Sequence, residues 1–266
     1  MKNYCDYHIH STLSLDGIST MAEQVAACRA AGVTKVCFTE HIDYDCNGRD
    51  FMVGFDRYQK SIEGVRAQFP DMHILMGLEL GDTTRDRAKV VELSNALPLD
   101  FKLLSRHQVD GVDPYMGDKF FEHRTRAQAA HDYCEAVYRT VTLFPDYDAV
   151  AHIGYVFKFA TGDGFPPLRW QDEPDLLDAT LKFMAEHGKA LEINTSRFIK
   201  FGDGMPGMDI LKRFRELGGE FVTLGSDSHQ VDTVAQGFDE VTERIKACGF
   251  DYLATYEQRK RVMWKL

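Results

Sequence analysis

The sequence has no apolar run approaching the roughly 20 residues that a membrane-spanning helix requires. None of its six cysteines stands in a Cys-x-x-Cys pair, and basic residues are fewer than acidic ones, 31 against 41, which gives a formal net charge of −10. These absences argue against a membrane protein and against nucleic acid as the main partner. They do not exclude a small anionic substrate, which responds to the local field of a pocket and not to the total charge.

The cysteines also indicate the compartment. Cys5 and Cys37 fall inside predicted strands, so buried reduced thiols are expected in preference to disulfides. The chain enters its first predicted strand by residue 4, so we expect no signal peptide. Together these features favour a cytoplasmic enzyme.

The first predicted strand, residues 4–9, ends in the motif His8-Ile9-His10. Side chains alternate faces along a strand, so both imidazoles point the same way, at a spacing that suits a transition metal such as zinc. Asp16 follows in a turn that ends at Gly17 and could return a carboxylate to the same place. Taken alone, the motif is also compatible with a half-buried strand that happens to carry two histidines.

Strands and helices are then predicted to alternate along the chain. The first helix begins at Ser19 or Thr20, with Glu23 at a capping-box distance from Thr20, and stops at Gly32. Further strands are expected at 33–39, 73–78, 101–105, 148–151, 190–193 and 220–224, and further helices at 55–69, 84–96, 125–143, 175–187, 208–217 and 234–247. Two segments, 108–121 and 161–167, are candidate lids, and the basic residues 259–261 are expected to be solvated.

Seven alternations imply a parallel sheet with helices outside it, either open and doubly wound or closed as a barrel. The C-terminal strand ends carry histidines and carboxylates throughout, and only a closed sheet brings all of these ends to one mouth. We therefore expect an α/β fold with a closed or nearly closed, TIM-like (β/α)7 barrel, formed as a single domain by residues 1–266.

Six of the ten histidines stand at predicted strand ends, whereas His73, His123, His131 and His187 are expected to pack or to face solvent. Three carboxylates join the six, and the set of potential metal ligands is His8, His10, Asp16, His41, Glu79, His107, His152, Asp227 and His229. One zinc ion takes about four ligands, so nine donors predict two or three divalent metal ions, with Glu79 as the expected bridge. The imidazole and carboxylate donors suit Zn, Mn or Fe, and clustered metals suit phosphate-ester hydrolysis.

The ordered motifs resemble those of the PHP (polymerase and histidinol phosphatase) family. They are His8-Ile-His10 with Asp16-Gly17, Thr39-Glu40-His41, Gly77-Leu-Glu79, Arg106-His107, Ala151-His152-Ile153, Glu192-Ile-Asn194 and Gly225-Ser-Asp227-Ser-His229. The likeness spans essentially the whole chain and is greatest to the stand-alone histidinol-phosphate phosphatases, which act in histidine biosynthesis. It implies a distorted seven-stranded barrel and a trinuclear metal centre.

The resemblance also implies the ligand sets. One metal would take His8, His10, Glu79 and Asp227, a second Glu79, His107 and His152, and a third Asp16, His41 and His229.

The resemblance implies roles in binding and catalysis as well. Lys158 and Arg197 would contact the substrate phosphate, and Arg106 is a further candidate for this contact. Asp16 or His229 would protonate the leaving alkoxide. As structural alternatives, Lys158 could be a surface lysine with a buried stem, and Arg197 a surface loop residue.

The sequence departs from the family pattern at Arg106, Gln108 and Gly154, which makes the alcohol attached to the phosphate uncertain. The expected activity is hydrolysis of a small phosphorylated substrate, L-histidinol phosphate first and a nucleotide or sugar phosphate as the alternative. An amidohydrolase is a further alternative, but such an enzyme would normally need eight strands and a bridging lysine. A non-catalytic metal-binding module would not need the complete ligand set.

Overall fold

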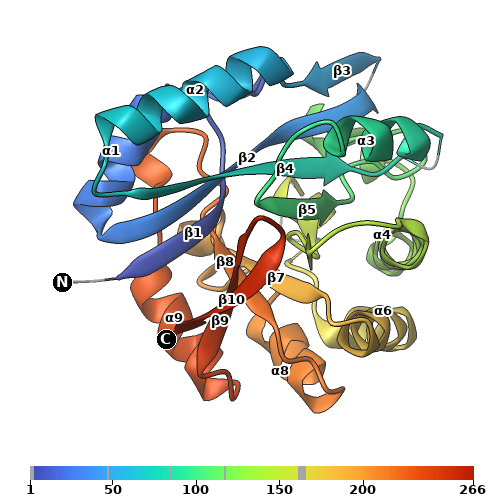
Figure 1. Ribbon diagram of the computed structural model, residues 1–266. Helices are drawn as coiled ribbons and strands as arrows, with labels where there is room; N and C mark the ends of the chain where they lie inside the picture. Colours follow the sequence, from blue (N-terminus) through green and yellow to red (C-terminus); the bar gives the residue numbers. More distant parts are fainter. Residues whose placement is uncertain (1–2, 47, 84, 117, 161–165) are drawn as a thin grey trace.

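The computed structural model describes residues 3–46, 48–83, 85–116, 118–160 and 166–266 (Figure 1). Most of the second candidate lid, 161–165, therefore lies outside the described residues. In the described ranges no helix combines the length and the apolar character needed to cross a membrane.

Seven parallel strands form the wall of a barrel, in the same order in space as in the sequence. They are β1 (Tyr4–Ile9), β2 (Val33–Cys46), β4 (His73–Gly81), β5 (Phe101–Ser105), β6 (Ala149–Val150), β7 (Ala190–Asn194) and β8 (Val222–Gly225). The first and last strands meet at their C-terminal ends, where His10 N donates to Ser228 O at 2.9 Å and Asp227 N to His8 O at 2.7 Å. The prediction of a nearly closed seven-stranded barrel is confirmed.

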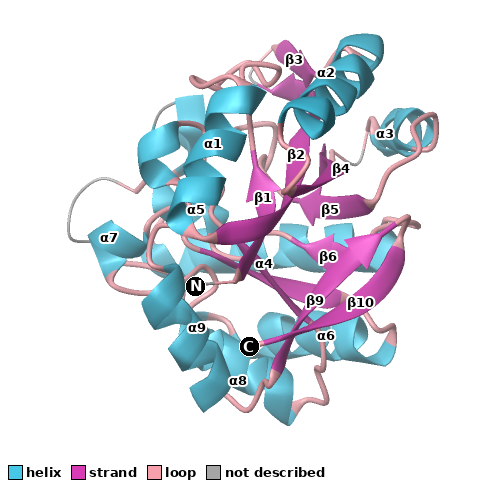
Figure 2. Ribbon diagram, turned by 60° about the vertical axis from the view of Figure 1, so that its left-hand side comes forward, coloured by secondary structure: helices cyan, strands magenta, loops and turns pink. Residues whose placement is uncertain are grey.

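The helices surround this sheet on its outer face (Figures 1 and 2). The longer ones are α1 (Met21–Ala31), α2 (Phe55–Gln68), α3 (Arg87–Ser94), α4 (Arg126–Leu143), α6 (Pro174–Glu186), α8 (Met208–Glu216) and α9 (Phe238–Ala247). The predicted capping box is present, since the Thr20 hydroxyl accepts from Glu23 N while the Glu23 carboxylate accepts from Thr20 N. The last helix was predicted to begin at residue 234, which is wrong, because Gly237 has φ +76°, outside the helical range.

Several connections differ from plain loops. Strand β2 extends seven residues beyond its predicted end and pairs with the short antiparallel strand β3 (Arg49–Met52). The helices α5 (Tyr155–Lys158) and α7 (Phe198–Phe201) follow β6 and β7 directly. The candidate lid 108–121 contains two single-turn helices, η1 (Pro114–Met116) and η2 (Asp118–Phe120).

A C-terminal hairpin closes the end of the barrel opposite the strand C-termini. The prediction of a solvated segment is confirmed for Lys260 and Arg261, which are exposed, and is wrong for Arg259. Strands β9 (Tyr252–Glu257) and β10 (Lys260–Lys265) pair antiparallel around residues 258 and 259. The Tyr7 hydroxyl inside the barrel donates to Tyr256 O at 2.9 Å. Arg259 is held by two carboxylates, with Nε 2.5 Å from Asp148 Oδ2 and Nη2 2.8 Å from Asp146 Oδ1.

Candidate metal centre

The nine predicted metal ligands converge at the C-terminal mouth of the barrel. Seven of them line one cavity of about 400 Å³, namely Asp16, His41, Glu79, His107, His152, Asp227 and His229. His8 and His10 lie fully buried beneath it at the end of β1. Their ring nitrogens point to the same spot, with the two Nε2 atoms 3.0 Å apart. The alternation of side chains along β1 therefore places both imidazoles on the same side, as the His-x-His spacing predicts.

Glu79 lies at the centre of the cluster and offers its two oxygens to different histidines. Its Oε1 lies 2.8 Å from His152 Nε2 and 3.0 Å from His107 Nε2. Its Oε2 lies 3.1 Å from His8 Nε2 and 3.4 Å from His10 Nε2. A carboxylate shared in this way has the geometry of a bridging ligand between two cations.

The other two carboxylates, Asp227 and Asp16, each lie near further imidazoles of the cluster. Asp227 Oδ1 lies 3.6 Å from the Nε2 atoms of both His8 and His10. Asp16 Oδ2 lies 3.1 Å from His229 Nε2 and 3.7 Å from His41 Nε2. The two carboxylates share one imidazole, because His229 Nδ1 also lies 3.6 Å from Asp227 Oδ1.

The residues present fit bound metal ions. Four groups of three side chains, each with ligand atoms within 4.8 Å of one another, occur in the described residues: His10, His41 and His229; His8, His10 and Asp227; His8, Glu79 and His152; and His41, Asp43 and His107. The second oxygen of Asp16, Oδ1, is buried without a hydrogen-bond partner among the described atoms. Buried carboxylate oxygens normally have a partner, so this atom favours a cation as its missing neighbour.

The electrostatics of the cluster keep its carboxylates charged. Burial by itself raises the pKa of Glu79, but His8, His107 and His41 outweigh it and hold that pKa well below its usual range. Burial likewise raises the pKa of Asp227, and Lys158 with the nearby histidines lowers it well below normal. Burial, followed by His229 and His41, lowers the pKa of His10. Burial by itself lowers the pKa of His8, His41 and His107, but the neighbouring carboxylates outweigh it and raise that pKa. Metal binds the charged carboxylate and the neutral imidazole, so these three histidines would release protons when metal binds.

Two carboxylates that sequence reasoning did not place in the centre orient its histidines. Asp43 Oδ1 lies 2.8 Å from His107 Nδ1, and Asp43 also lines the cavity. Glu192 Oε1 lies 2.6 Å from His8 Nδ1. Such partners fix which ring nitrogen faces the metal. For Asp43 a signal existed, because it follows His41 by two residues on the same strand and so shares its face.

Two of the three predicted phosphate-binding residues line the metal cavity. Lys158 lies in α5, with Nζ 2.6 Å from Asp227 Oδ2, and its side chain is 12% exposed. Arg197 lies just before α7, and its Nε is buried without a hydrogen-bond partner among the described atoms. Both cations therefore flank the predicted metal ligands.

The third residue predicted to bind phosphate, Arg106, does not line this cavity. Its Nη1 donates to Asp82 O at 2.7 Å, and its side chain lines a neighbouring cavity together with Gln108. Side chains of adjacent residues point in opposite directions in extended backbone, so His107 faces the metal cavity while Arg106 and Gln108 face away. The third departure, Gly154, has φ +116°, a conformation that disfavours the aspartate usual in the family.

Comparison with known proteins agrees with the fold and the motif series. The PHP domain family model matches residues 6–196. A histidinol-phosphatase of Lactococcus lactis subsp. lactis is 31% identical over 96% of this chain and 95% of its own length. A Thermotoga maritima protein named a probable histidinol-phosphatase is 27% identical over 98% of this chain and 99% of its own.

A solved structure shows the same architecture. The crystal structure of histidinol phosphate phosphatase from Lactococcus lactis, complexed with zinc, L-histidinol and phosphate, matches 97% of this chain and 98% of its own at a TM-score of 0.90 and 30% identity. The family match covers more than half of the chain and includes the strand-end motifs from β1 to β7. This chain belongs to the PHP family.

Proposed function

We propose that this chain is a metal-dependent phosphomonoesterase that hydrolyses L-histidinol phosphate to L-histidinol and phosphate. The observation that most supports this proposal is the cluster of nine donors, seven of which line a cavity that Lys158 and Arg197 also line. The similarity over nearly the whole length to the Lactococcus lactis histidinol-phosphatase supports the substrate. Residues 1–266 form one catalytic unit in this proposal.

The proposed cofactors are two to three divalent transition-metal ions, Zn, Mn or Fe. His8, His10, Glu79 and Asp227 would hold one, Glu79, His107 and His152 a second, and Asp16, His41 and His229 a third. When bound, such ions lower the pKa of the water that they bind, so that it can lose a proton at neutral pH, and they polarise phosphoryl oxygens. Asp43 and Glu192 orient the imidazoles that would hold them.

The chain's own residues bind the phosphoryl group and move the proton. The guanidinium of Arg197 and the ammonium of Lys158 pair with phosphate oxygens through charge-assisted hydrogen bonds. Asp16 and His229 lie 3.1 Å apart at the cavity edge. Burial raises the pKa of Asp16, but His41 and His229 outweigh it and hold that pKa far below its usual range, so this carboxylate carries no proton to donate. Of the two candidates, His229 is therefore the proposed donor to the leaving alkoxide.

The rest of the cavity suits an aromatic, positively charged alcohol. Its wall includes the aromatic rings of Phe51, Tyr115, Tyr155 and Phe159. The buried carboxylate Asp113 also lines it. An imidazole ring packs on aromatic faces, and an ammonium group pairs with a carboxylate. L-Histidinol has both groups.

A phosphate-release screen of zinc-loaded or manganese-loaded protein tests the proposal, using L-histidinol phosphate, nucleotides and sugar phosphates. We expect the highest kcat/KM for L-histidinol phosphate. A higher value for a nucleotide or sugar phosphate would retain the phosphatase and reject the substrate. No phosphate release from any of them would reject the activity itself.

The cysteines support a cytoplasmic location. Of the six, the five that the structure describes as to their side chains, Cys5, Cys28, Cys37, Cys134 and Cys248, are free thiols. Free thiols are usual in the reducing cytoplasm, and we propose that compartment.

A further inference from the structure

A buried glutamate that the proposed metal sites do not use lies directly behind them. Glu40 precedes His41 in β2 and is fully buried. Adjacent side chains of a strand point to opposite sides, so His41 lines the metal cavity while Glu40 faces away from it. Of the motif Thr39-Glu40-His41, only the histidine is a predicted metal ligand.

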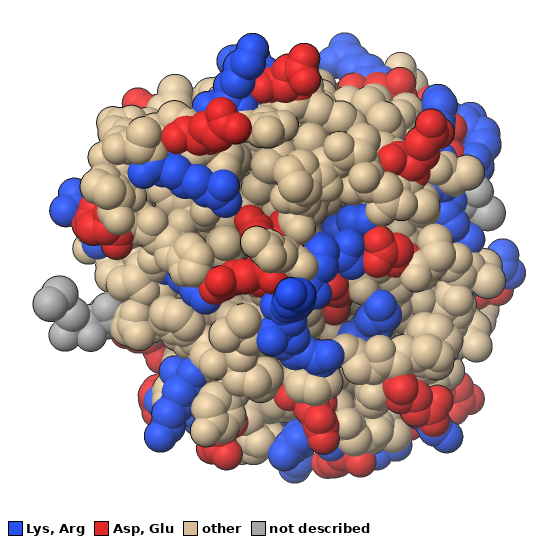
Figure 3. Space-filling model, in the orientation of Figure 1, with Lys and Arg blue, Asp and Glu red and all other residues tan. Residues whose placement is uncertain are grey.

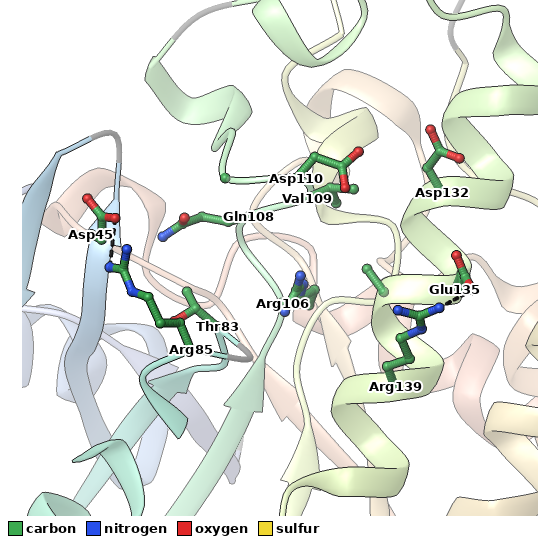
Figure 4. Close-up of a pocket in the computed structure, with 12 residues that line it drawn as sticks. Asp45, Thr83, Arg85, Arg106, Gln108, Val109, Asp110, Asp132, Glu135 and Arg139 are labelled. Atoms are coloured by element: carbon green, nitrogen blue, oxygen red, sulfur yellow. Dashed lines mark hydrogen bonds and ion pairs between the residues drawn. The ribbon is translucent and has the colours of Figure 1, made fainter. Parts of the chain in front are cut away.

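The hydrogen-bond partners of Glu40 are uncharged. Many acidic side chains of this protein lie among cations: acidic and basic side chains intermingle on the face shown in Figure 3, and in the cavity beside Arg106, Asp45 pairs with Arg85 (Figure 4). The donors to Glu40 in the described residues are instead one backbone N–H and two hydroxyl groups. Burying a carboxylate among uncharged groups costs free energy, which points to a function for this position.

The three donors to Glu40 come from Ser11 and Ser14. Oε1 accepts from Ser11 N at 3.1 Å and from Ser11 Oγ at 2.5 Å, and Oε2 accepts from Ser14 Oγ at 2.5 Å. Both serines belong to the loop after β1 that carries Asp16, a proposed metal ligand. On the other side of this loop, Asp16 Oδ2 lies 3.1 Å from His229 Nε2. Glu40 therefore anchors the loop that places Asp16 in the cluster.

Ser14 also connects Glu40 to a second proposed metal ligand, His10. The Ser14 Oγ lies 3.4 Å from His10 Nδ1 and accepts from His41 N at 3.2 Å. Because the hydroxyl hydrogen of Ser14 goes to Glu40, its oxygen acts as the acceptor for His10. Nδ1 of His10 then carries the proton, and Nε2, which lies 3.0 Å from His8 Nε2, presents its lone pair to the cluster.

The same arrangement occurs directly at two other histidines of the cluster. Glu192 and Asp43 contact the Nδ1 atoms of His8 and His107 at 2.6 and 2.8 Å. At the third histidine the carboxylate acts through a serine hydroxyl, and the contact of 3.4 Å is longer than either of these. The serine should therefore contribute near the lower end of the roughly 10- to 100-fold that such partners add to metal affinity.

We propose that Glu40 is a positioning residue of the metal centre. It orients His10 through Ser14, and it holds the loop of Asp16 through two serines. This inference rests on the proposed metal sites, because Glu40 itself contacts neither metal nor substrate. Cations held by His10 and Asp16 would also offset the buried negative charge of Glu40.

Competition with a chelator for zinc tests the proposal. Ser14→Ala should weaken zinc binding about tenfold, and Glu40→Gln, which disturbs both proposed ligands, by up to about 100-fold. The matched control Ser94→Ala removes a buried hydroxyl on α3 that donates to Val91 O, and it should leave the affinity unchanged. If Glu40→Gln does not fold, Ser14→Ala decides.

Proton NMR of zinc-loaded protein labelled with ¹⁵N-histidine separates positioning from a general loss of stability. The Nδ1–H signal of His10 should shift upfield in Ser14→Ala, because the proton loses its acceptor, while the signals of His8 and His107 stay in place. Either wild-type zinc affinity or an unmoved His10 signal in Ser14→Ala would overturn the role of Glu40 alone. Failure of the wild-type protein to bind zinc would overturn the metal centre as well.

Discussion

The Nζ atom of Lys158 lies 2.6 Å from Oδ2 of Asp227. The lysine is on α5, after β6, and the aspartate follows β8, so the ion pair links two segments at the mouth of the barrel that only β7 separates. It joins a proposed phosphate-binding cation to a proposed metal ligand. The position of Lys158 beside the phosphate site is therefore tied to the same carboxylate that the metal would use.

Lys158→Met keeps the length of the side chain and removes its charge. We expect KM for L-histidinol phosphate to rise and kcat/KM to fall about tenfold, the cost of roughly one charge-assisted hydrogen bond. Steady-state kinetics with metal analysis measure this, and Lys200→Met on α7 is the matched control. An unchanged KM would show that Lys158 serves only as the partner of Asp227.

Arg197→Ala removes the second proposed phosphate contact. The metals should stay in place while kcat/KM falls on the order of 10²-fold on any phosphomonoester, or roughly 2.7 kcal/mol of transition-state stabilisation. Arg197→Lys should recover only part of this, because an ammonium group cannot make the paired contact. Near-normal kcat/KM in Arg197→Ala would show that Arg197 is a loop residue that does not contact the phosphate.

The strand-end part of the centre could be predicted from sequence because β alternation is strict over short distances. His8 and His10 come to one spot for that reason, and their Nε2 atoms lie 3.0 Å apart. Asp43 was missed because β2 was expected to end at residue 39, whereas pairing with β3 extends the strand. Strand ends set by a tertiary partner are not encoded in local propensity.

Arg259 and Arg106 differ from the expectations for two separate reasons. Arg259 was predicted to be solvated from the local run of basic residues, yet it pairs with Asp146 and Asp148, more than a hundred residues away. Arg106 was expected as a further phosphate contact, but adjacent side chains take opposite directions, so Arg106 lines a neighbouring cavity while His107 faces the metal cavity. Nothing in the local sequence specifies the two carboxylate partners of Arg259.

Asp43→Asn tests whether this carboxylate positions the histidines. Asn preserves the shape but weakens the contact with His107 Nδ1, so we expect metal affinity to fall about 10- to 100-fold. Competition with a chelator measures the affinity, and Asp50→Asn at the exposed hairpin of β2 and β3 is the control. Retention of wild-type affinity would show that His107 is oriented without Asp43.

The ion pair between Arg259 of the C-terminal hairpin and Asp146 should make the free energy of unfolding depend on pH. Hydrogen bonds from Arg259 lower the pKa of Asp146. The ionised form of Asp146 is therefore favoured in the folded state. The stabilising contribution of the ion pair to the free energy of unfolding is present above the pKa of Asp146 in the unfolded chain, about 4, and is lost as the pH falls through its lower pKa in the folded protein.

Arg259→Gln should accordingly lower the free energy of unfolding by about 1–2 kcal/mol near pH 7, a figure moderated by the partial exposure of Asp146. The difference from wild type should shrink as the pH falls below about 4. Urea unfolding across this range measures it. Arg261→Gln, whose side chain stacks on Phe221, should show a difference that does not depend on pH. A constant difference for Arg259→Gln would be evidence against the ion pair.

The central claim is that nine side chains form one multinuclear metal site, and metal stoichiometry tests it most directly. Elemental analysis of protein active on L-histidinol phosphate should find two to three transition-metal ions per chain. Glu79→Gln, which removes the charge between the two sets of histidines, should lose at least one ion together with activity and lower the Tm. One ion or none in an active preparation, or a full metal complement in Glu79→Gln, would contradict the account.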